Sequence, residues 1–311
     1  MIPPTAHFVW LGRKLPWVYV LGVLAAARRG GFERVLLHHI DELEEDAGIV
    51  ELVAEPRVEL TRLDPLPLLE AGGGPNFVDR YRDLEQPAAR ANVVRMALLE
   101  QEGGVYLDTD TIAIRSFAGV LAQGGAFCGE ERLVYPGSAG TGLLSRVRPG
   151  ALLRTGARDV FRRLPRGDRY FRRFEHLYPK AVNNAVLGAE AHHPFLRELI
   201  GRAVALSADR RQIRYAFGTH LLQAAVAEYK GPSLHVLPPP VFYPLAPEIS
   251  EHWFRPRRRA RLEEVLAPET LLVHWYASVR TARHIAQIDR AWLTEHAEDR
   301  LFAALALRAL G

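Results

Sequence analysis

The sequence predicts an α/β fold in which a mixed, mostly parallel sheet is flanked by helices. Apolar runs of strand length lie at residues 6–11, 33–40 and 58–63, and a helix pattern fills residues 17–29. Strands that alternate with helices favour parallel pairing, because a parallel pair needs a crossover between its two strands. The chain has 311 residues, 48% of them hydrophobic, which is enough for the core of one large domain.

The segment at residues 90–111, RANVVRMALLEQEGGVYLDTDT, combines a helix, a helix stop and a strand. Apolar residues recur at helical spacing, and the double glycine follows where a helix C-terminus needs a left-handed residue. Asn92 and Arg95 are three positions apart, so they lie on one side of this helix. The next residues, 105–112, predict a strand.

Asp108 and Asp110 stand at the end of this predicted strand. Alternate residues of a strand point to the same face, so both carboxylates are expected beside Tyr106, about 6.6 Å apart along the strand. Such a pair can hold one divalent cation, and Mg²⁺ or Mn²⁺ suits oxygen ligands completed by phosphate and water. The motif Asp-x-Asp is short, and a solvated turn after an edge strand is the alternative interpretation.

Residues 95–110, RMALLEQEGGVYLDTD, resemble the signature of the DXD-motif glycosyltransferases. That group includes fungal initiating mannosyltransferases, bacterial capsule-type sugar transferases and the large glucosylating toxins. Its pattern is Asp-x-x-Arg on a helix, then Gly-Gly-x-Tyr and Asp-x-Asp, and this chain departs from it once, with Asn92 in place of the first aspartate. The resemblance implies a GT-A-like fold and a metal-dependent transferase that uses a nucleotide-sugar donor.

The first predicted strand resembles the same family in the order His7, Phe8, Trp10 and Gly12. In the family, the tryptophan at the end of the first strand stacks on the nucleotide base, which implies that role for Trp10. The alternative is a tryptophan of the hydrophobic core. No G-x-G-x-x-G follows this strand, which counts against a dinucleotide-binding Rossmann unit.

Two later stretches resemble family segments around the donor. In KAVNNAVLGAEAHHPFL the resemblance implies that Asn184 contacts donor-sugar hydroxyls, and a turn asparagine is the alternative. In LLVHWYAS it implies that His274 completes the metal shell or contacts the diphosphate, and a buried structural histidine is the alternative. Trp275 and Ser278 are implied as donor contacts by the same stretch, although residues 279–280 depart from the family pattern.

These residues predict a glycosyltransferase that moves a sugar from a nucleotide-sugar donor to an unknown acceptor. A UDP-sugar is favoured over GDP-mannose, and the acceptor can be a glycan, a protein or a small molecule. Asp108 and Asp110 would hold Mn²⁺ or Mg²⁺ as a Lewis acid, Arg95 would donate to diphosphate or sugar oxygens, and Tyr106 would line the donor pocket. The resemblance, with no acceptor-side carboxylate clearly placed by the sequence, predicts retention of the anomeric configuration.

Two other classes of function compete with this interpretation. A metal-dependent phosphohydrolase would use the same aspartates, but it normally needs a larger cluster of Asp, His or Glu than the sequence offers near the motif. A nucleic-acid-binding protein would use the basic run RPRRRAR at residues 255–261, for which a surface loop is the plain interpretation. The net charge of +4 is modest for this length and does not by itself indicate nucleic acid as a partner.

We expect a single GT-A-like domain over residues 1–311. Residues 131–179 are rich in Gly, Arg and Pro and predict an insertion or acceptor loop whose arginines lie on a solvated face. Residues 291–310 predict one amphipathic terminal helix packed on the sheet. No run of eighteen apolar residues occurs, so no membrane span is expected, and Cys128 as the only cysteine fits a reducing cytoplasm.

Overall fold

The computed structural model describes residues 1–133, 149–207, 216–277 and 281–311. Its main sheet has seven strands in the order β3-β2-β1-β4-β7-β6-β8, and a small second sheet pairs β5 with β9. The strands are β1 Thr5–Trp10, β2 Arg34–His39, β3 Val58–Arg62, β4 Gly104–Leu107, β5 Thr111–Ala113, β6 Ala126–Arg132, β7 Lys180–Ala189, β8 Leu234–Leu237 and β9 Leu272–His274. In the described part of the main sheet, β7 is antiparallel to β4 and β6, and the other neighbouring strands pair in parallel. The predicted fold class, a mixed and mostly parallel sheet flanked by helices, is confirmed.

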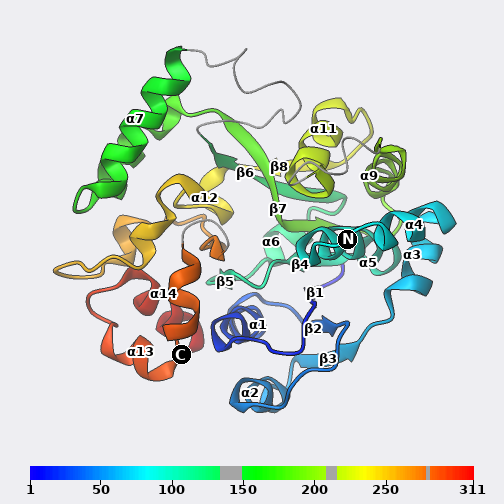
Figure 1. Ribbon diagram of the computed structural model, residues 1–311, viewed down its shortest axis with the longest axis horizontal. Helices are drawn as coiled ribbons and strands as arrows, with labels where there is room; N and C mark the ends of the chain where they lie inside the picture. The colour runs from blue at the N-terminus through cyan, green and yellow to red at the C-terminus, as the bar shows by residue number, and fades with distance from the viewer. Residues whose placement is uncertain (134–148, 208–215, 278–280) are drawn as a thin grey trace.

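Helices cover both faces of the main sheet, with α1 and α14 on one side and α5, α4 and α3 on the other (Figure 1). The α-helices are α1 Trp17–Arg29, α2 Ala47–Ala54, α3 Pro65–Gly73, α4 Pro75–Arg82, α5 Pro87–Glu102, α6 Ala118–Leu121, α7 Pro149–Arg163, α8 Gly167–Phe174, α9 Pro194–Ala205, α11 Leu221–Glu228, α12 Pro239–Phe242, α13 Arg290–Glu295 and α14 Leu301–Leu310. Shorter helical turns include η1 Glu175–Leu177, η2 Ala216–His220, η3 Pro247–Trp253, η4 Leu262–Glu264 and η6 Ala282–Gln287. Within the described residues, none of the helices has the length and apolar character needed to cross a membrane.

The α5–β4 connection forms as the double glycine predicts. Gly103 closes α5 with φ 68°, and Gly104 follows with φ 91°, in the region that favours glycine. A Cβ on Gly104 would also lie 2.6 Å from the carbonyl oxygen of Thr5, so β4 can enter the sheet beside β1 only with glycine at this position. This connection places the end of β4 in the middle of the sheet.

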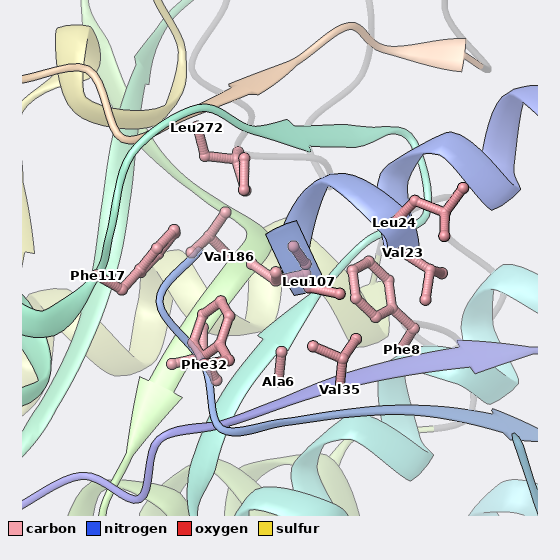
Figure 2. Packing of buried hydrophobic residues seen from close by; sticks show 14 of the residues in the cluster. Ala6, Phe8, Val23, Leu24, Phe32, Val35, Leu107, Phe117, Val186 and Leu272 are labelled. Atoms are coloured by element: carbon pink, nitrogen blue, oxygen red, sulfur yellow. The ribbon is translucent and has the colours of Figure 1, made fainter. Parts of the chain in front are cut away.

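The core on the α1 side is built from inward-facing residues of the central strands. Figure 2 shows Phe8 of β1, Leu107 of β4 and Val186 of β7 packed with Val23 and Leu24 of α1, and all five belong to one buried cluster. The opposite face of the sheet packs on α5 and α9 through a second buried cluster. Burial on both faces explains why the strands read as continuous apolar runs in the sequence.

The strand predicted at residues 105–112 is interrupted at the aspartates. β4 ends at Leu107, the amide of Asp108 still donates to the carbonyl oxygen of Ala185, and the chain then turns, with the amide of Thr111 donating to the carbonyl oxygen of Asp108. β5 starts at Thr111 and pairs with β9 instead of continuing in the main sheet. The two aspartates therefore belong to a turn between two sheets, and strand alternation does not govern them.

The C-terminal expectation of one helix over residues 291–310 is also wrong in part. α13 ends at Glu295, a turn follows, and α14 begins at Leu301. The carbonyl oxygens of Glu298 and Asp299 accept hydrogen bonds from the backbone amides of Ala260 and Arg257, respectively. These tertiary contacts stabilise the turn and keep α13 and α14 separate. α14 then packs beside α1.

Residues 131–179 contain the end of β6 and the helices α7 and α8, although residues 134–148 lie outside the described part. The arginines of this region were expected on a solvated face, and several instead bond to the body of the protein. Arg158 pairs with Glu248 at 3.0 Å and Arg162 pairs with Glu251 at 2.8 Å. These ion pairs fix α7 against η3.

Candidate active site

The turn that carries Asp108 and Asp110 is fixed from two directions. On the β7 side the amide of Asp108 bonds to the carbonyl oxygen of Ala185 at 2.8 Å. On the β9 side the amide of Trp275 donates to the carbonyl oxygen of Asp110 at 3.1 Å, and the amide of Ala277 donates to its Oδ2 at 2.8 Å. Both aspartates are thus held at the junction of the two sheets.

His274, at the end of β9, lies beside the second aspartate. Its Nε2 is 3.1 Å from Oδ2 of Asp110, and Thr111 is its partner in the β5–β9 ladder. Burial lowers the pKa of His274, but the charges of Asp110 and Asp108 outweigh burial and raise this pKa above its ordinary value. For Asp110, burial acts to raise the pKa, and His274 and the Ala277 amide bring it below its ordinary value. The two side chains therefore form an ion pair in this structure.

Asp108, Asp110 and His274 form a three-ligand cluster. Each offers one ligand atom, and these atoms all lie within 4.8 Å of one another. Two carboxylates and one imidazole fit Mn²⁺ or Mg²⁺, with imidazole better suited to Mn²⁺ than to Mg²⁺. Nδ1 of His274 is buried without a hydrogen-bond partner among the described residues, so the ring is not committed to a second protein contact.

Arg95 is a buried cation that ties α5 to the turn. Its Nη2 donates to Oδ1 of Asp108 at 2.7 Å, and its Nη1 donates to the carbonyl oxygen of Asn184. Its guanidinium also lies 3.9 Å from the ring centroid of Tyr106. A cation placed between a carboxylate, a carbonyl oxygen and an aromatic face is stabilised despite its burial. Arg95 therefore orients the carboxylate of Asp108.

Asn92 and Asn184, expected near the donor sugar, contact each other. Nδ2 of Asn184 donates to Oδ1 of Asn92 at 2.8 Å. A Cβ on Gly218 would lie 2.9 Å from Nδ2 of Asn92 and 3.1 Å from Nδ2 of Asn184, so the backbone of η2 closes over the pair. The sequence did not predict this contact, because the two residues come from α5 and β7.

These side chains line a cleft of about 780 Å³. Its walls include the described residues Trp10, Asn92, Arg95, Tyr106, Asp108, Asp110, Asn184 and His274. The ring of Trp10 is half-buried and lies 5.2 Å from the ring of Tyr19, and its indole Nε1 has no hydrogen-bond partner among the described residues. The cleft thus joins eight of the residues that the sequence singled out.

One predicted donor contact, Trp275, does not line this cleft, and another lies outside the described residues. Trp275 is fully buried and packs against Tyr19, Phe254 and Phe302, so its expected contact with the donor is contradicted by its place in the core. Strand alternation explains the error, because its neighbours His274 and Tyr276 face the cleft. Ser278 lies outside the described residues.

The structure adds cleft residues that sequence reasoning missed. Glu131 is buried and accepts a hydrogen bond from the hydroxyl of Tyr276 at 2.8 Å, and burial raises the pKa of its carboxyl above the ordinary value. Arg158 and Glu248 form part of the opposite wall. Tyr276 was detectable by alternation with His274, whereas nothing in the local sequence singled out Glu131.

Comparison with known proteins assigns the central part of this site. Residues 44–126 match the family described as glycosyltransferase sugar-binding region containing DXD motif. The match spans α5, β4 and the turn with Asp108-Thr109-Asp110. This segment is similar to the sugar-binding region of the DXD-containing glycosyltransferases. The DXD motif of the matched family thus falls on the turn described above.

Several solved structures share a similar chain path with this protein. They include the PaToxG glycosyltransferase, with 13% identity, 73% of this chain and 69% of that chain covered, and a TM-score of 0.47. Mouse xyloside xylosyltransferase 1 in its apo form has 13% identity, coverage of 87% and 96%, and a TM-score of 0.45. The galactosyltransferase LgtC, in complex with donor and acceptor sugar analogues, has 13% identity, coverage of 94% and 99%, and a TM-score of 0.42. No curated protein sequence matches the chain, and at these TM-scores the structural likeness carries no conclusion about substrates.

The competing classes of function are not favoured by the described residues. The cluster of candidate metal-ligating side chains found there has three members, fewer than a two-metal phosphohydrolase requires. The basic run at residues 255–261 is not a uniform surface stripe, because Arg257 is buried and pairs with Asp168 at 2.9 Å.

Proposed function

We propose that this protein is a glycosyltransferase that transfers a sugar from a nucleotide-sugar donor, a UDP-sugar ahead of GDP-mannose, in a reaction that depends on Mn²⁺ or Mg²⁺. The observation that carries the proposal is the convergence of Asp108, Asp110 and His274 within 4.8 Å at a cleft of about 780 Å³. Ligand sites of about 300–1,000 Å³ accommodate molecules of nucleotide-sugar size. The acceptor is a glycan, a protein or a small molecule.

The three ligands would hold the cation, and a bound cation would neutralise charge on the departing nucleoside diphosphate. Arg95 contributes in two ways. Its ion pair with Asp108, at 2.7 Å, keeps that carboxylate oriented, and its guanidinium adds positive charge to the cleft wall. Because Arg95 is buried, its position is set before the donor arrives.

The remaining donor contacts divide between base and sugar. Trp10 presents a half-buried ring to the cleft, and stacking on a base contributes about 1–3 kcal/mol. Asn92 and Asn184 bond to each other and both line the cleft. We assign their side-chain amides to the hydroxyl groups of the donor sugar. The ring of Tyr106 packs against the guanidinium of Arg95 and so helps to hold Arg95 in the cleft.

Retention of the anomeric configuration is part of the proposal. The two additional carboxylates of the cleft are both engaged, because Glu131 accepts from Tyr276 and Glu248 pairs with Arg158. Because a protein partner occupies each of these carboxylates, we assign the acceptor proton to the leaving phosphate. We also propose one domain over residues 1–311 and a cytoplasmic location, the latter on the single, buried Cys128.

The direct test is turnover of a donor panel. The protein is incubated with UDP-glucose, UDP-galactose, UDP-N-acetylglucosamine and GDP-mannose, in Mn²⁺ or in EDTA, and the release of nucleoside diphosphate is measured. We expect release from a UDP-sugar in Mn²⁺ only, and an α-linked product or α-sugar by NMR when the donor is α-linked. Asp110→Asn should abolish release, and Asp79→Asn, an exposed aspartate on α4, should not. Equal release in EDTA would refute the metal dependence, and a β-linked first product would refute retention.

A further inference from the structure

Exposed apolar side chains gather on one part of this protein. Large hydrophobic residues that are exposed in the described part are Met1, Val50, Val53, Leu153, Val160, Leu164, Tyr170, Phe174 and Leu177. Six of these nine lie between residues 153 and 177, on α7, α8, η1 and the connection between α7 and α8. Single exposed apolar residues are ordinary, whereas a group of this kind marks an interaction surface.

The exposed residues form two stripes that meet. Leu153 and Val160 of α7 are seven positions apart, so they lie on one helical face, and Leu164 follows directly after the helix. Tyr170 and Phe174 of α8 are four positions apart and share a face as well. The ring of Phe174 stacks on Phe161 of α7 with 6.0 Å between centroids, which joins the two stripes.

The other faces of these helices are already bonded to the protein. Arg158 and Arg162 of α7 pair with Glu248 and Glu251 of η3, and Asp168 of α8 is buried against Arg257. The exposed stripes therefore point outward in a fixed orientation, uncovered by the described part of the chain. α7 stands at the edge of the molecule, away from the main sheet (Figure 1).

Arginines alternate with these apolar residues. Arg163, Arg169 and Arg173 are exposed, and none of the ion pairs of the described residues involves them. The nearby loop adds the exposed residues Arg258, Arg259 and Arg261. Arg166 of the α7–α8 connection pairs with Glu264 of η4, which fixes this loop next to α8.

The acidic groups of the same region are largely neutralised. Asp159 lies 3.0 Å from Arg158, Asp168 is buried with Arg257, and Glu264 bonds to Arg166. Glu263 remains exposed on η4. The outward surface of α7, α8 and the loop at 255–261 is therefore positively charged and apolar at once.

We infer that this surface docks on an anionic lipid bilayer. Basic side chains gain from a negatively charged headgroup layer, and the interleaved Leu, Val, Tyr and Phe side chains gain from the interfacial region beneath it. A nucleic acid would use the arginines but would leave the aliphatic stripe of α7 in water. Arg158 of α7 lines the cleft, so docking through α7 and α8 brings one cleft wall close to the bilayer. On the proposed function, the acceptor is then a molecule held at a membrane surface.

The test is cosedimentation of the full chain with vesicles, which requires neither donor nor metal. We expect binding to an equal mixture of phosphatidylcholine and phosphatidylglycerol, and at least tenfold weaker binding to phosphatidylcholine alone. The charge variant Arg163→Glu/Arg169→Glu/Arg173→Glu and the apolar variant Leu164→Ser/Tyr170→Ser/Leu177→Ser should each lower binding at least tenfold.

Matched controls carry the same changes elsewhere on the surface. Arg62→Glu/Arg82→Glu/Arg308→Glu reverses three exposed arginines, and Val50→Ser/Val53→Ser removes two exposed valines of α2. Both controls should bind as the original protein does, and thermal unfolding of every variant confirms that it is folded. Absent vesicle binding, unchanged binding by the charge or apolar variant, or binding to single-stranded RNA without binding to vesicles would each overturn the inference. None of these outcomes bears on donor turnover, which is measured separately with a soluble acceptor.

Discussion

Asn92 is the residue at which this chain departs from the family pattern, and the structure gives the departure a physical meaning. An aspartate at this position would offer only acceptors, whereas Asn92 uses Oδ1 to accept from Asn184 and keeps an NH₂ donor. The donor sugar is therefore expected to present an acceptor, such as an N-acetyl carbonyl, where related enzymes bind a hydroxyl. The sequence predicted the residue, but its pairing with Asn184 through Oδ1 could be known only from the fold.

Asn92→Asp should change the ranking of donors. The variant loses the NH₂ donor and gains a charge, and hydrogen bonds to charged groups contribute about 1.5–3 kcal/mol against about 0.5–1.5 for neutral ones. For Asn92→Asp we expect the kcat/KM for UDP-glucose, divided by the kcat/KM for UDP-N-acetylglucosamine, to rise about tenfold. Asn92→Ala should lower kcat/KM for both donors. The same ranking and the same rates in Asn92→Asp would show that this residue does not contact the sugar.

His7 and His38 form a buried pair that the sequence did not reveal. Nδ1 of His7 lies 3.0 Å from Nε2 of His38, and Nε2 of His7 lies 3.1 Å from the carbonyl oxygen of Gly103. Because a carbonyl oxygen only accepts, Nε2 of His7 carries the proton and Nδ1 accepts from His38. Burial, and then His38, lowers the pKa of His7 from 6.5 to about 3, and burial, and then His39, lowers the pKa of His38 from 6.5 to about 4.

This pair predicts loss of stability in mild acid. The unfolded chain binds these protons more readily than the folded protein, so the stabilisation is present in full above pH 6.5 and is lost as the pH falls toward 4. The free energy of unfolding should fall by about 1.4 kcal/mol per pH unit for each neutral histidine in that window. Urea unfolding across this range should show a clearly flatter pH dependence for His7→Gln/His38→Gln. Parallel pH profiles for the two proteins would rule out the pair as the cause.

At the scale of elements, prediction was accurate where one helix or strand is specified by its own residues. α1 occupies residues 17–29 as predicted, because an apolar helix pattern ends at two glycines. The strand at 105–112 was predicted too long, since β5 pairs with β9, which lies far along the chain. The break between α13 and α14 was missed for the same reason, because its carbonyls bond to the loop at 257–260.

The contact between α1 and the DXD turn gives an element-scale prediction. A Cβ on Gly22 of α1 would lie 2.6 Å from the carbonyl oxygen of Thr109 and 2.7 Å from that of Thr111. Gly22→Ala should therefore displace the turn and destabilise the fold by about 1–3 kcal/mol, the usual effect of overpacking. Gly201→Ala on α9, where nothing lies within 4 Å, should instead stabilise by about 0.5–1 kcal/mol.

Urea unfolding of the two alanine variants measures both effects. Gly22→Ala should also weaken UDP binding in Mn²⁺, because Asp108 and Asp110, the proposed metal ligands, flank Thr109. Equal shifts in the same direction for Gly22→Ala and Gly201→Ala would show that α1 does not hold the turn in place.

For the whole molecule, the cleft is where distant parts of the chain meet. The amide of Ala277 bonds to Asp110 across 167 positions, and Tyr276 bonds to Glu131 across 145. Sequence reasoning recovered the cleft residues that belong to recognisable motifs, such as Trp10 and Arg95. It could not place Glu131, because no local pattern distinguishes this glutamate, and it assigned Trp275 to the donor, because adjacent strand residues face opposite sides.

The most direct measurement is a calorimetric titration of UDP into the protein, in Mn²⁺ and in EDTA. The cluster of Asp108, Asp110 and His274 predicts that UDP binds at least tenfold more tightly in Mn²⁺. Asp110→Asn and His274→Ala, both in Mn²⁺, should bind UDP as weakly as the original protein does in EDTA, and Asp79→Asn should match the original protein in Mn²⁺. UDP affinity that is the same in EDTA and in Mn²⁺, or that survives in both site variants, would contradict a metal-assisted donor site at this cleft.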